Sequence, residues 1–167
     1  MKVATTFGAS KADRGSVEYQ EGIELGKFLS QKGFIVKCGG YGGLMEAVSK
    51  GVYEIGGTCI GIGLEEFDRF RPSNPYLSKK ILVKTLYERL ELLIEGSELF
   101  VAQKGSIGTL NEIFMVAALK YGGLKPNIRI VLLGEFYKSL NCFDENFLQN
   151  VEIYDTLTEF ERNFERV

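Results

Sequence analysis

A glycine-rich segment over residues 104–112 carries the residue types best suited to chemistry in this chain. Its sequence, Lys-Gly-Ser-Ile-Gly-Thr-Leu-Asn-Glu, follows an apolar run at 99–102 and leads into an amphipathic helical pattern. Glycines allow a ligand to approach the backbone closely, and the first N–H groups of a helix have no partner within the helix. Because Ser106 and Thr109 add hydroxyl donors, the segment predicts a binding site for a phosphate group.

A second glycine-rich loop, Gly39-Gly40-Tyr41-Gly42-Gly43, follows a short apolar strand pattern at 34–36. The carboxyl ends of parallel strands meet at one edge of a sheet, so both glycine loops are expected at the edge where such sheets bind ligands. The first expected strand ends in Gly8-Ala9-Ser10, which lacks the G-x-G-x-x-G dinucleotide pattern, and no P-loop pattern occurs anywhere. The sequence therefore indicates a phosphate site of another kind.

Glu112 and Arg89 are the charged residues that could act on a bound phosphosugar. Glu112 lies one helical turn past the last glycine of this segment, and Arg89 lies on the preceding expected helix. A fixed carboxylate stabilises the positively charged transition state of glycosidic bond cleavage, and an arginine can grip phosphate or ribose. The alternative is that Glu112 only complements its own helix dipole and that Arg89 is a solvated surface residue. Spacing alone leaves both readings open.

The composition excludes several classes of site. The chain has no histidine, so Ser-His-Asp triads, Cys-His pairs and histidine metal sites are excluded. Its three cysteines are scattered, which indicates reduced thiols in a cytoplasmic protein. The formal net charge of -2 gives no reason to expect binding to nucleic acid or to a membrane surface. We expect neither a metal nor a cofactor.

Apolar strand patterns alternate with amphipathic helical patterns along all 167 residues. This alternation predicts an α/β fold, a Rossmann-like three-layer sandwich with a mostly parallel sheet, in a single domain over 1–167. In the loop expected at 64–78, a solvent-exposed position for Arg69 and Arg71 is favoured over one that covers the cleft. The expected strands lie at about 2–7, 34–36, 58–62, 81–83, 99–102, 128–133 and 151–153, and helices at about 16–32, 44–55, 85–95, 110–121 and 135–148 and from about 158.

Three segments together resemble the LOG family, whose members are often labelled lysine decarboxylases. Residues 104–112 resemble its P-G-G-x-G-T-x-x-E signature, residues 39–45 its G-G-G-x-x-G-L-M loop, and residues 86–90 its M-x-x-R-K stretch. The resemblance covers about residues 1–140. It implies a Rossmann-like homodimer that splits a nucleoside 5′-monophosphate into free base and ribose 5-phosphate, with the active site near the dimer interface.

The resemblance also assigns roles to residues. It gives Arg89 and Glu112 the catalytic places. Lys104 replaces the proline of the signature and Ser106 its second glycine, which leaves open a binding or carrier protein that holds a nucleotide or phosphorylated cofactor without turnover. Pyridoxal-dependent decarboxylation is disfavoured, because nothing indicates a Schiff-base lysine. The implied phosphate- and substrate-binding residues are Gly8, Ser10, Gly39, Gly40, Gly43, Met45, Gly105, Ser106, Gly108 and Thr109.

Overall fold

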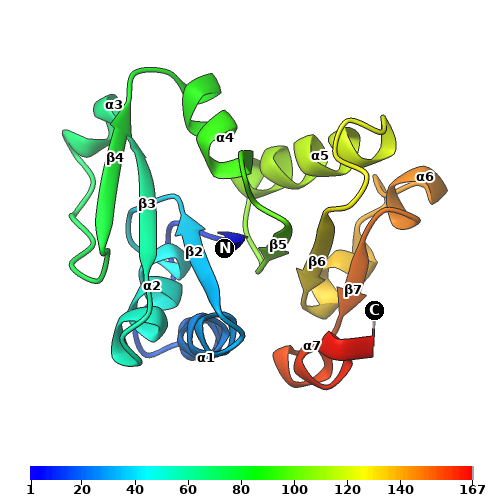
Figure 1. Cartoon of the computed structure of the whole chain (residues 1–167), viewed down its shortest axis with the longest axis horizontal. Helices are drawn as coiled ribbons and strands as arrows, with labels where there is room; N and C mark the ends of the chain where they lie inside the picture. Colours follow the sequence, from blue (N-terminus) through cyan, green and yellow to red (C-terminus); the bar gives the residue numbers. More distant parts are fainter. Residues whose placement is uncertain (167) are drawn as a thin grey trace.

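The computed structural model describes residues 1–166, which form one seven-stranded sheet with the order β4-β3-β2-β1-β5-β6-β7 (Figure 1). All neighbouring strands are parallel, which confirms the predicted Rossmann-like α/β fold. From β1 the chain moves outward to β4, then returns to place β5 on the other side of β1. The strand order therefore reverses between β1 and β5. The strands are β1 Lys2–Phe7, β2 Phe34–Cys38, β3 Cys59–Leu64, β4 Lys79–Val83, β5 Leu99–Ala102, β6 Arg129–Leu133 and β7 Glu152–Tyr154.

Helices cover both faces of this sheet and make the predicted third layer (Figure 1). Leu99 and Val101 of β5 pack in a core with α1, α2 and α7, whereas Phe100 and Ala102 pack on the opposite face with α4, α5 and α6. No helix within residues 1–166 is long and apolar enough to cross a bilayer. The helices are α1 Val17–Gln31, α2 Leu44–Glu54, α3 Glu65–Asp68, α4 Leu86–Ile94, α5 Ile107–Tyr121, α6 Glu145–Leu148 and α7 Leu157–Asn163, with short 3₁₀ turns at Glu135–Ser139 and Phe164–Arg166.

The helix that carries Arg89 begins at a capping box. The Thr85 hydroxyl accepts a hydrogen bond from the N–H of Glu88, and the Glu88 carboxylate accepts one from the N–H of Thr85. These two bonds satisfy N–H groups that the helix itself leaves unpaired. The box therefore fixes where α4 starts, and with it the turn on which Arg89 lies.

Two sequence expectations about these elements are wrong. One helix was expected at 135–148, but the chain forms a 3₁₀ turn and then the separate α6, whose first turn is capped by Asp144. The apolar pattern that suggested one helix belongs instead to an aromatic cluster, in which the rings of Phe143 and Phe147 stack 4.0 Å apart. The apolar pattern at 85–95 also predicts that Leu86 faces inward, but Leu86 is 51% exposed.

Helices α1 and α2 cross at glycines that allow the two backbones to touch. A Cβ atom on Gly51 would lie 1.9 Å from the carbonyl oxygen of Ile23, and one on Gly26 would lie 2.1 Å from that of Val48. Both positions therefore exclude any side chain while the helices keep this spacing.

We expect Gly51→Ala to destabilise the protein by about 1–3 kcal/mol, because the methyl group forces α1 and α2 apart. Gly15→Ala is the matched control, since a Cβ atom there meets nothing within 4 Å. Urea unfolding of both variants measures the difference. An unchanged midpoint for Gly51→Ala would show that the helix contact tolerates a side chain.

Candidate functional site

A cavity of about 300 Å³ opens at the carboxyl edge of the sheet, across the point where the strand order reverses. This is the place where open parallel sheets bind ligands. Its walls come from the end of β1, the loops after β2 and β3, and the first turns of α4 and α5. The sequence-predicted residues that line it are Gly8, Ser10, Gly39, Met45, Arg89, Ser106, Gly108, Thr109 and Glu112.

Arg89 lies at the floor of this cavity with its side chain only 11% exposed. Its Nε atom donates to the carbonyl oxygen of Ile62 at 2.8 Å, and Nη2 donates to that of Gly39 at 3.1 Å. These two carbonyls belong to the ends of β3 and β2, so the guanidinium is held by the sheet edge. The alternative of a solvated surface arginine is therefore wrong.

Glu112 approaches the same guanidinium from α5. Its Oε1 atom lies 3.8 Å from Arg89 Nη1, a distance too long for a hydrogen bond. Burial raises the pKa of Glu112 to about 7, although the positive charge of Arg89 acts to lower it. Within residues 1–166 its carboxylate accepts no hydrogen bond, so both oxygens are available to a ligand.

The first turn of α5 supplies donors beside these two charges. Ser106 is the N-cap but makes no capping bond with its side chain, and the first N–H bonded within the helix is that of Leu110. The three preceding amides, over 107–109, are therefore without helical partners, which favours an anion. Ser106 has φ -110°, so serine replaces the glycine of the signature without strain.

The three loops around the cavity are joined through Ala9. Its N–H donates to the carbonyl of Lys104 at 3.1 Å, and its carbonyl accepts from the N–H of Leu44 at 2.9 Å. Gly43, at φ +67°, lies so close that a Cβ atom there would be 2.4 Å from the Ala9 oxygen. The loops after β1, β2 and β5 thus form one unit.

Three predicted binding residues do not line this cavity, and one of them, Gly105, lines a neighbouring cavity instead. Gly43 holds the loop after β2 against Ala9, and Gly40, at φ +80°, packs on the backbone of Gly61. A Cβ atom on Gly105 would lie 2.1 Å from Thr109 Oγ1. These glycines shape the walls by allowing close packing.

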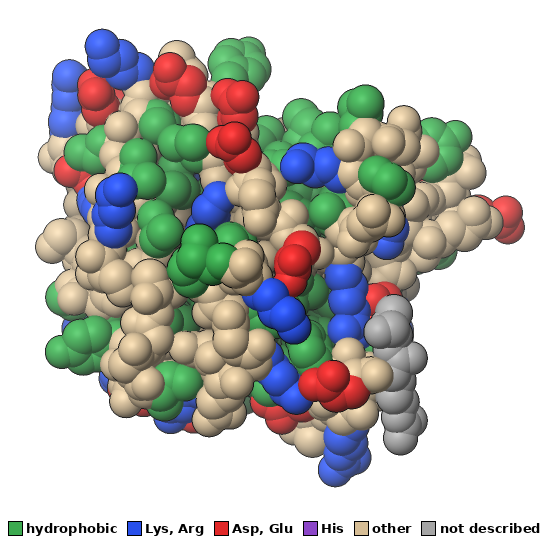
Figure 2. All heavy atoms as spheres, viewed as in Figure 1, with side chains coloured by type: hydrophobic (Ala, Val, Ile, Leu, Met, Phe, Trp, Pro, Cys, Tyr) green, Lys and Arg blue, Asp and Glu red, His purple; other side chains and the backbone are tan. Residues whose placement is uncertain are grey.

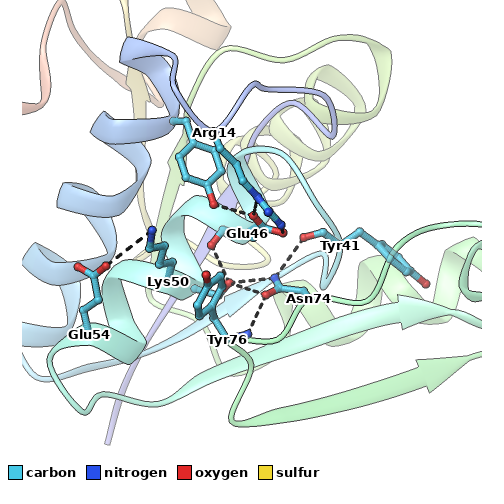
Figure 3. A network of polar contacts seen from close by, with 9 residues as sticks. Arg14, Tyr41, Glu46, Lys50, Glu54, Asn74 and Tyr76 are labelled. Atoms are coloured by element: carbon cyan, nitrogen blue, oxygen red, sulfur yellow. Dashed lines mark hydrogen bonds and ion pairs between the residues drawn. The ribbon is translucent and has the colours of Figure 1, made fainter.

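A buried polar network supports the wall formed by α2 (Figure 3). Glu46, next to Met45, accepts hydrogen bonds from Arg14 at 2.8 and 3.1 Å and from the Tyr19 hydroxyl at 2.6 Å. Burial alone would raise the pKa of Glu46, but these hydrogen bonds outweigh burial and lower it. Asn74 donates to the carbonyl of Tyr41 at 3.1 Å, which anchors the loop after β3 to the same wall.

The cavity is also lined by residues that were not predicted for the site: Thr6, Phe7, Ala9, Phe67, Arg71, Leu86 and Ile107. Phe67 of α3 and Arg71 of the loop that follows it line the cavity, so the solvent-exposed position favoured for Arg71 is wrong. Arg69 is exposed as expected and pairs with Glu66 at 3.3 Å. The sequence signal for this position is an aromatic residue, Phe67, four positions before Arg71. This spacing does not reveal which of the two arginines, Arg69 or Arg71, points into the cavity.

A second cavity, of about 580 Å³, adjoins the first. The two share Ala9, Ser10 and Ser106 in their linings, and Lys11 and Lys104 contribute to the second. The edge of the sheet therefore has room for a ligand longer than one that fills the first cavity.

A parallel sheet with a cavity at the switch point defines a Rossmann-like α/β protein. Residues 2–155 match the SLOG cluster4 family, and the chain belongs to this family. The membership confirms the LOG-like resemblance read from the glycine motifs.

Similarity to known proteins supports this family assignment. A protein of Rhodococcoides fascians named cytokinin riboside 5′-monophosphate phosphoribohydrolase is 28% identical over 149 residues, which are 87% of this chain and 75% of the relative. The X-ray structure of TM1055 superposes with a TM-score of 0.77 at 29% identity and covers 100% of both chains. The molybdenum cofactor binding protein of Rippkaea orientalis shares the fold at a TM-score of 0.76 and 19% identity, covering 99% of this chain and 97% of that one.

Glu112 should make stability depend on pH. Its pKa is raised from 4.5 to about 7 in the folded state, so its ionisation costs stability as pH rises through that interval. We expect Glu112→Gln to become more stable relative to wild type by about 3 kcal/mol between about pH 4.5 and pH 8. Urea unfolding across this range measures the difference. A difference independent of pH would mean that Glu112 has an ordinary pKa.

Proposed function

We propose that this protein hydrolyses the N-glycosidic bond of a nucleoside 5′-monophosphate, releasing free base and ribose 5-phosphate. The observation that carries the proposal is the Arg89–Glu112 pair, buried beside the open first turn of α5 in one cavity. A phosphate on that turn presents its ribose to the carboxylate one turn further along. The name of the Rhodococcoides fascians relative describes the same reaction class.

The proposed chemistry needs no group beyond these side chains and water. As the bond from C1′ to the base breaks, the base leaves with the electron pair, and positive charge develops on the ribose. The carboxylate of Glu112 stabilises that charge and takes a proton from the water that attacks C1′, and transfer of this proton to the departing base gives the free base and restores the carboxylate. Arg89 favours the ionised carboxylate, since its charge acts to lower the pKa of Glu112.

We expect Glu112→Gln to lower kcat for base release by about 100-fold or more, because the amide cannot balance the ribosyl charge. In the wild type, kcat/KM should rise with pH and level off above about 7, as Glu112 loses its proton. Chromatography of the base released from purine and pyrimidine monophosphates measures both effects. Glu98→Gln, an exposed glutamate at the opposite edge of the sheet, is the control. Full activity of Glu112→Gln contradicts the proposal.

A second candidate function is a carrier that holds a phosphorylated ligand without cleaving it. The adjoining cavity of about 580 Å³ favours it, since Ser10 and Ser106 face both spaces and a longer ligand could occupy them together. The Rippkaea orientalis protein of the same fold is titled a molybdenum cofactor binding protein. Thermal stabilisation by a phosphorylated ligand, without release of any base, would favour this function over hydrolysis.

The proposed enzyme is a homodimer that pairs through α4 and α5. Hydrophobic side chains gather over these helices along the upper edge of Figure 2, and a groove of about 390 Å³ lies between them. Tyr87 is 87% exposed beside the groove, while Leu86 and Ile107 are exposed at the mouth of the catalytic cavity. A second copy on this surface would bury the apolar area and close the mouth.

We expect sedimentation equilibrium to give twice the 18.7 kDa mass of one chain. Tyr87→Lys should shift the protein towards monomer and lower base release, because the mouth of the cavity then stays open to water. Val17→Lys, an equally exposed apolar position on α1, should leave the mass unchanged. A wild-type monomer that retains full activity would contradict the dimer.

A further inference from the structure

The two ends of the cavity that contains Arg89 and Glu112 lie at different strands of the sheet. The first turn of α5 follows β5, and along the sheet edge come the ends of β1, β2 and β3 in that order. Adjacent strands lie about 4.8 Å apart, so the distance from β5 to β3 is roughly 14 Å. If the phosphate lies on α5 and the ribose at Glu112, the base must lie towards the loop after β3. That loop contributes Phe67 and Arg71 to the lining.

Arg71 is held in place by aromatic rings instead of by an acid. Its guanidinium carbon lies 4.3 Å from the ring centre of Phe67 and 5.3 Å from that of Tyr41. Its backbone N–H donates to the carbonyl of Phe67 at 2.9 Å, and Asn74 anchors the loop just beyond it. The position of this side chain is thus determined by the protein before any ligand arrives.

The donors of Arg71 are free to recognise a ligand. Within residues 1–166 its guanidinium makes no ion pair and no hydrogen bond, whereas Arg69 pairs with Glu66. A planar guanidinium carries a fork of N–H donors and no acceptor, so it selects groups that present two adjacent acceptors. Arg71 therefore favours a ligand that presents two adjacent acceptors at the end of the cavity where the base would lie.

We propose that Arg71 makes this protein select 6-oxopurine nucleoside 5′-monophosphates, those of guanosine and inosine, over that of adenosine. The inference rests on the proposed function and names its substrate class. An oxopurine presents O6 and N7 side by side, which a guanidinium binds with two parallel hydrogen bonds. Adenine presents N7 beside an amino group, whose N–H would face the N–H donors of Arg71. Phe67 packs against the guanidinium itself, so the preference comes from the donors of Arg71.

The test compares kcat/KM for guanosine, inosine and adenosine monophosphates in the wild type, in Arg71→Lys and in Arg69→Lys. We expect the wild type to prefer both oxopurine nucleotides by about tenfold or more. Arg71→Lys keeps the charge but loses the fork, so it should reduce kcat/KM for the oxopurine nucleotides and leave that for adenosine monophosphate nearly unchanged. Arg69→Lys, in the same loop but outside the cavity, should behave as the wild type.

Titration calorimetry with the same nucleotides measures binding independently of cleavage. It therefore tests the base preference separately from hydrolysis. Tighter binding of the oxopurine nucleotides that Arg71→Lys abolishes supports the inference, even if no base is released and hydrolysis is thereby wrong. Equal cleavage of all three nucleotides, or an equal loss for all three in Arg71→Lys, overturns the inference while hydrolysis stands. A protein that neither binds nor cleaves any of them overturns both.

Discussion

The burial of one guanidinium charge at the carboxyl edge of the sheet is the constraint on which the site depends. A buried arginine must replace its lost hydration with hydrogen bonds, and Arg89 finds two backbone carbonyls, those of Ile62 and Gly39. These bonds tie α4 to the ends of β3 and β2. They also leave no room for a side chain at Gly39, where a Cβ atom would lie 2.2 Å from the guanidinium. The shape of the glycine loop and the position of the arginine therefore depend on each other.

The ionisation of Glu112, the second charged residue of the site, depends on both its burial and the charge of Arg89. Burial favours the protonated form of Glu112, the charge of Arg89 favours the ionised form, and the resulting pKa of about 7 leaves both forms accessible near neutral pH. The unpaired amides at the start of α5 add a region of positive potential next to this pair. One cavity can thus bind a dianionic group at those amides and stabilise a developing cation beside Glu112. The hydrogen bonds of Ala9 hold the loops around the cavity in fixed positions relative to each other.

Local sequence patterns predicted the elements of the fold, because most strands contain a short apolar run and the long helices are amphipathic. They failed at 135–148, where Phe143 and Phe147 satisfy the apolar pattern by stacking across a turn. The glycine motifs located the edge of the sheet, but they could not separate Gly39, which borders the cavity, from Gly40 and Gly105, which allow close packing behind it. The sequence did not favour the inward position of Arg71, because that position depends on contacts with Phe67 and Tyr41, which no local pattern encodes.

The most direct test of this account is a crystal structure of the Glu112→Gln protein with a nucleoside 5′-monophosphate. The substitution slows the proposed cleavage and leaves the remaining walls of the cavity intact. We expect phosphate oxygens within hydrogen-bond distance of the N–H groups of Gly108 and Thr109, with C1′ of the ribose beside residue 112. A phosphate bound instead by Lys11 and Lys104 in the adjoining cavity, with the ribose remote from residue 112, would contradict it.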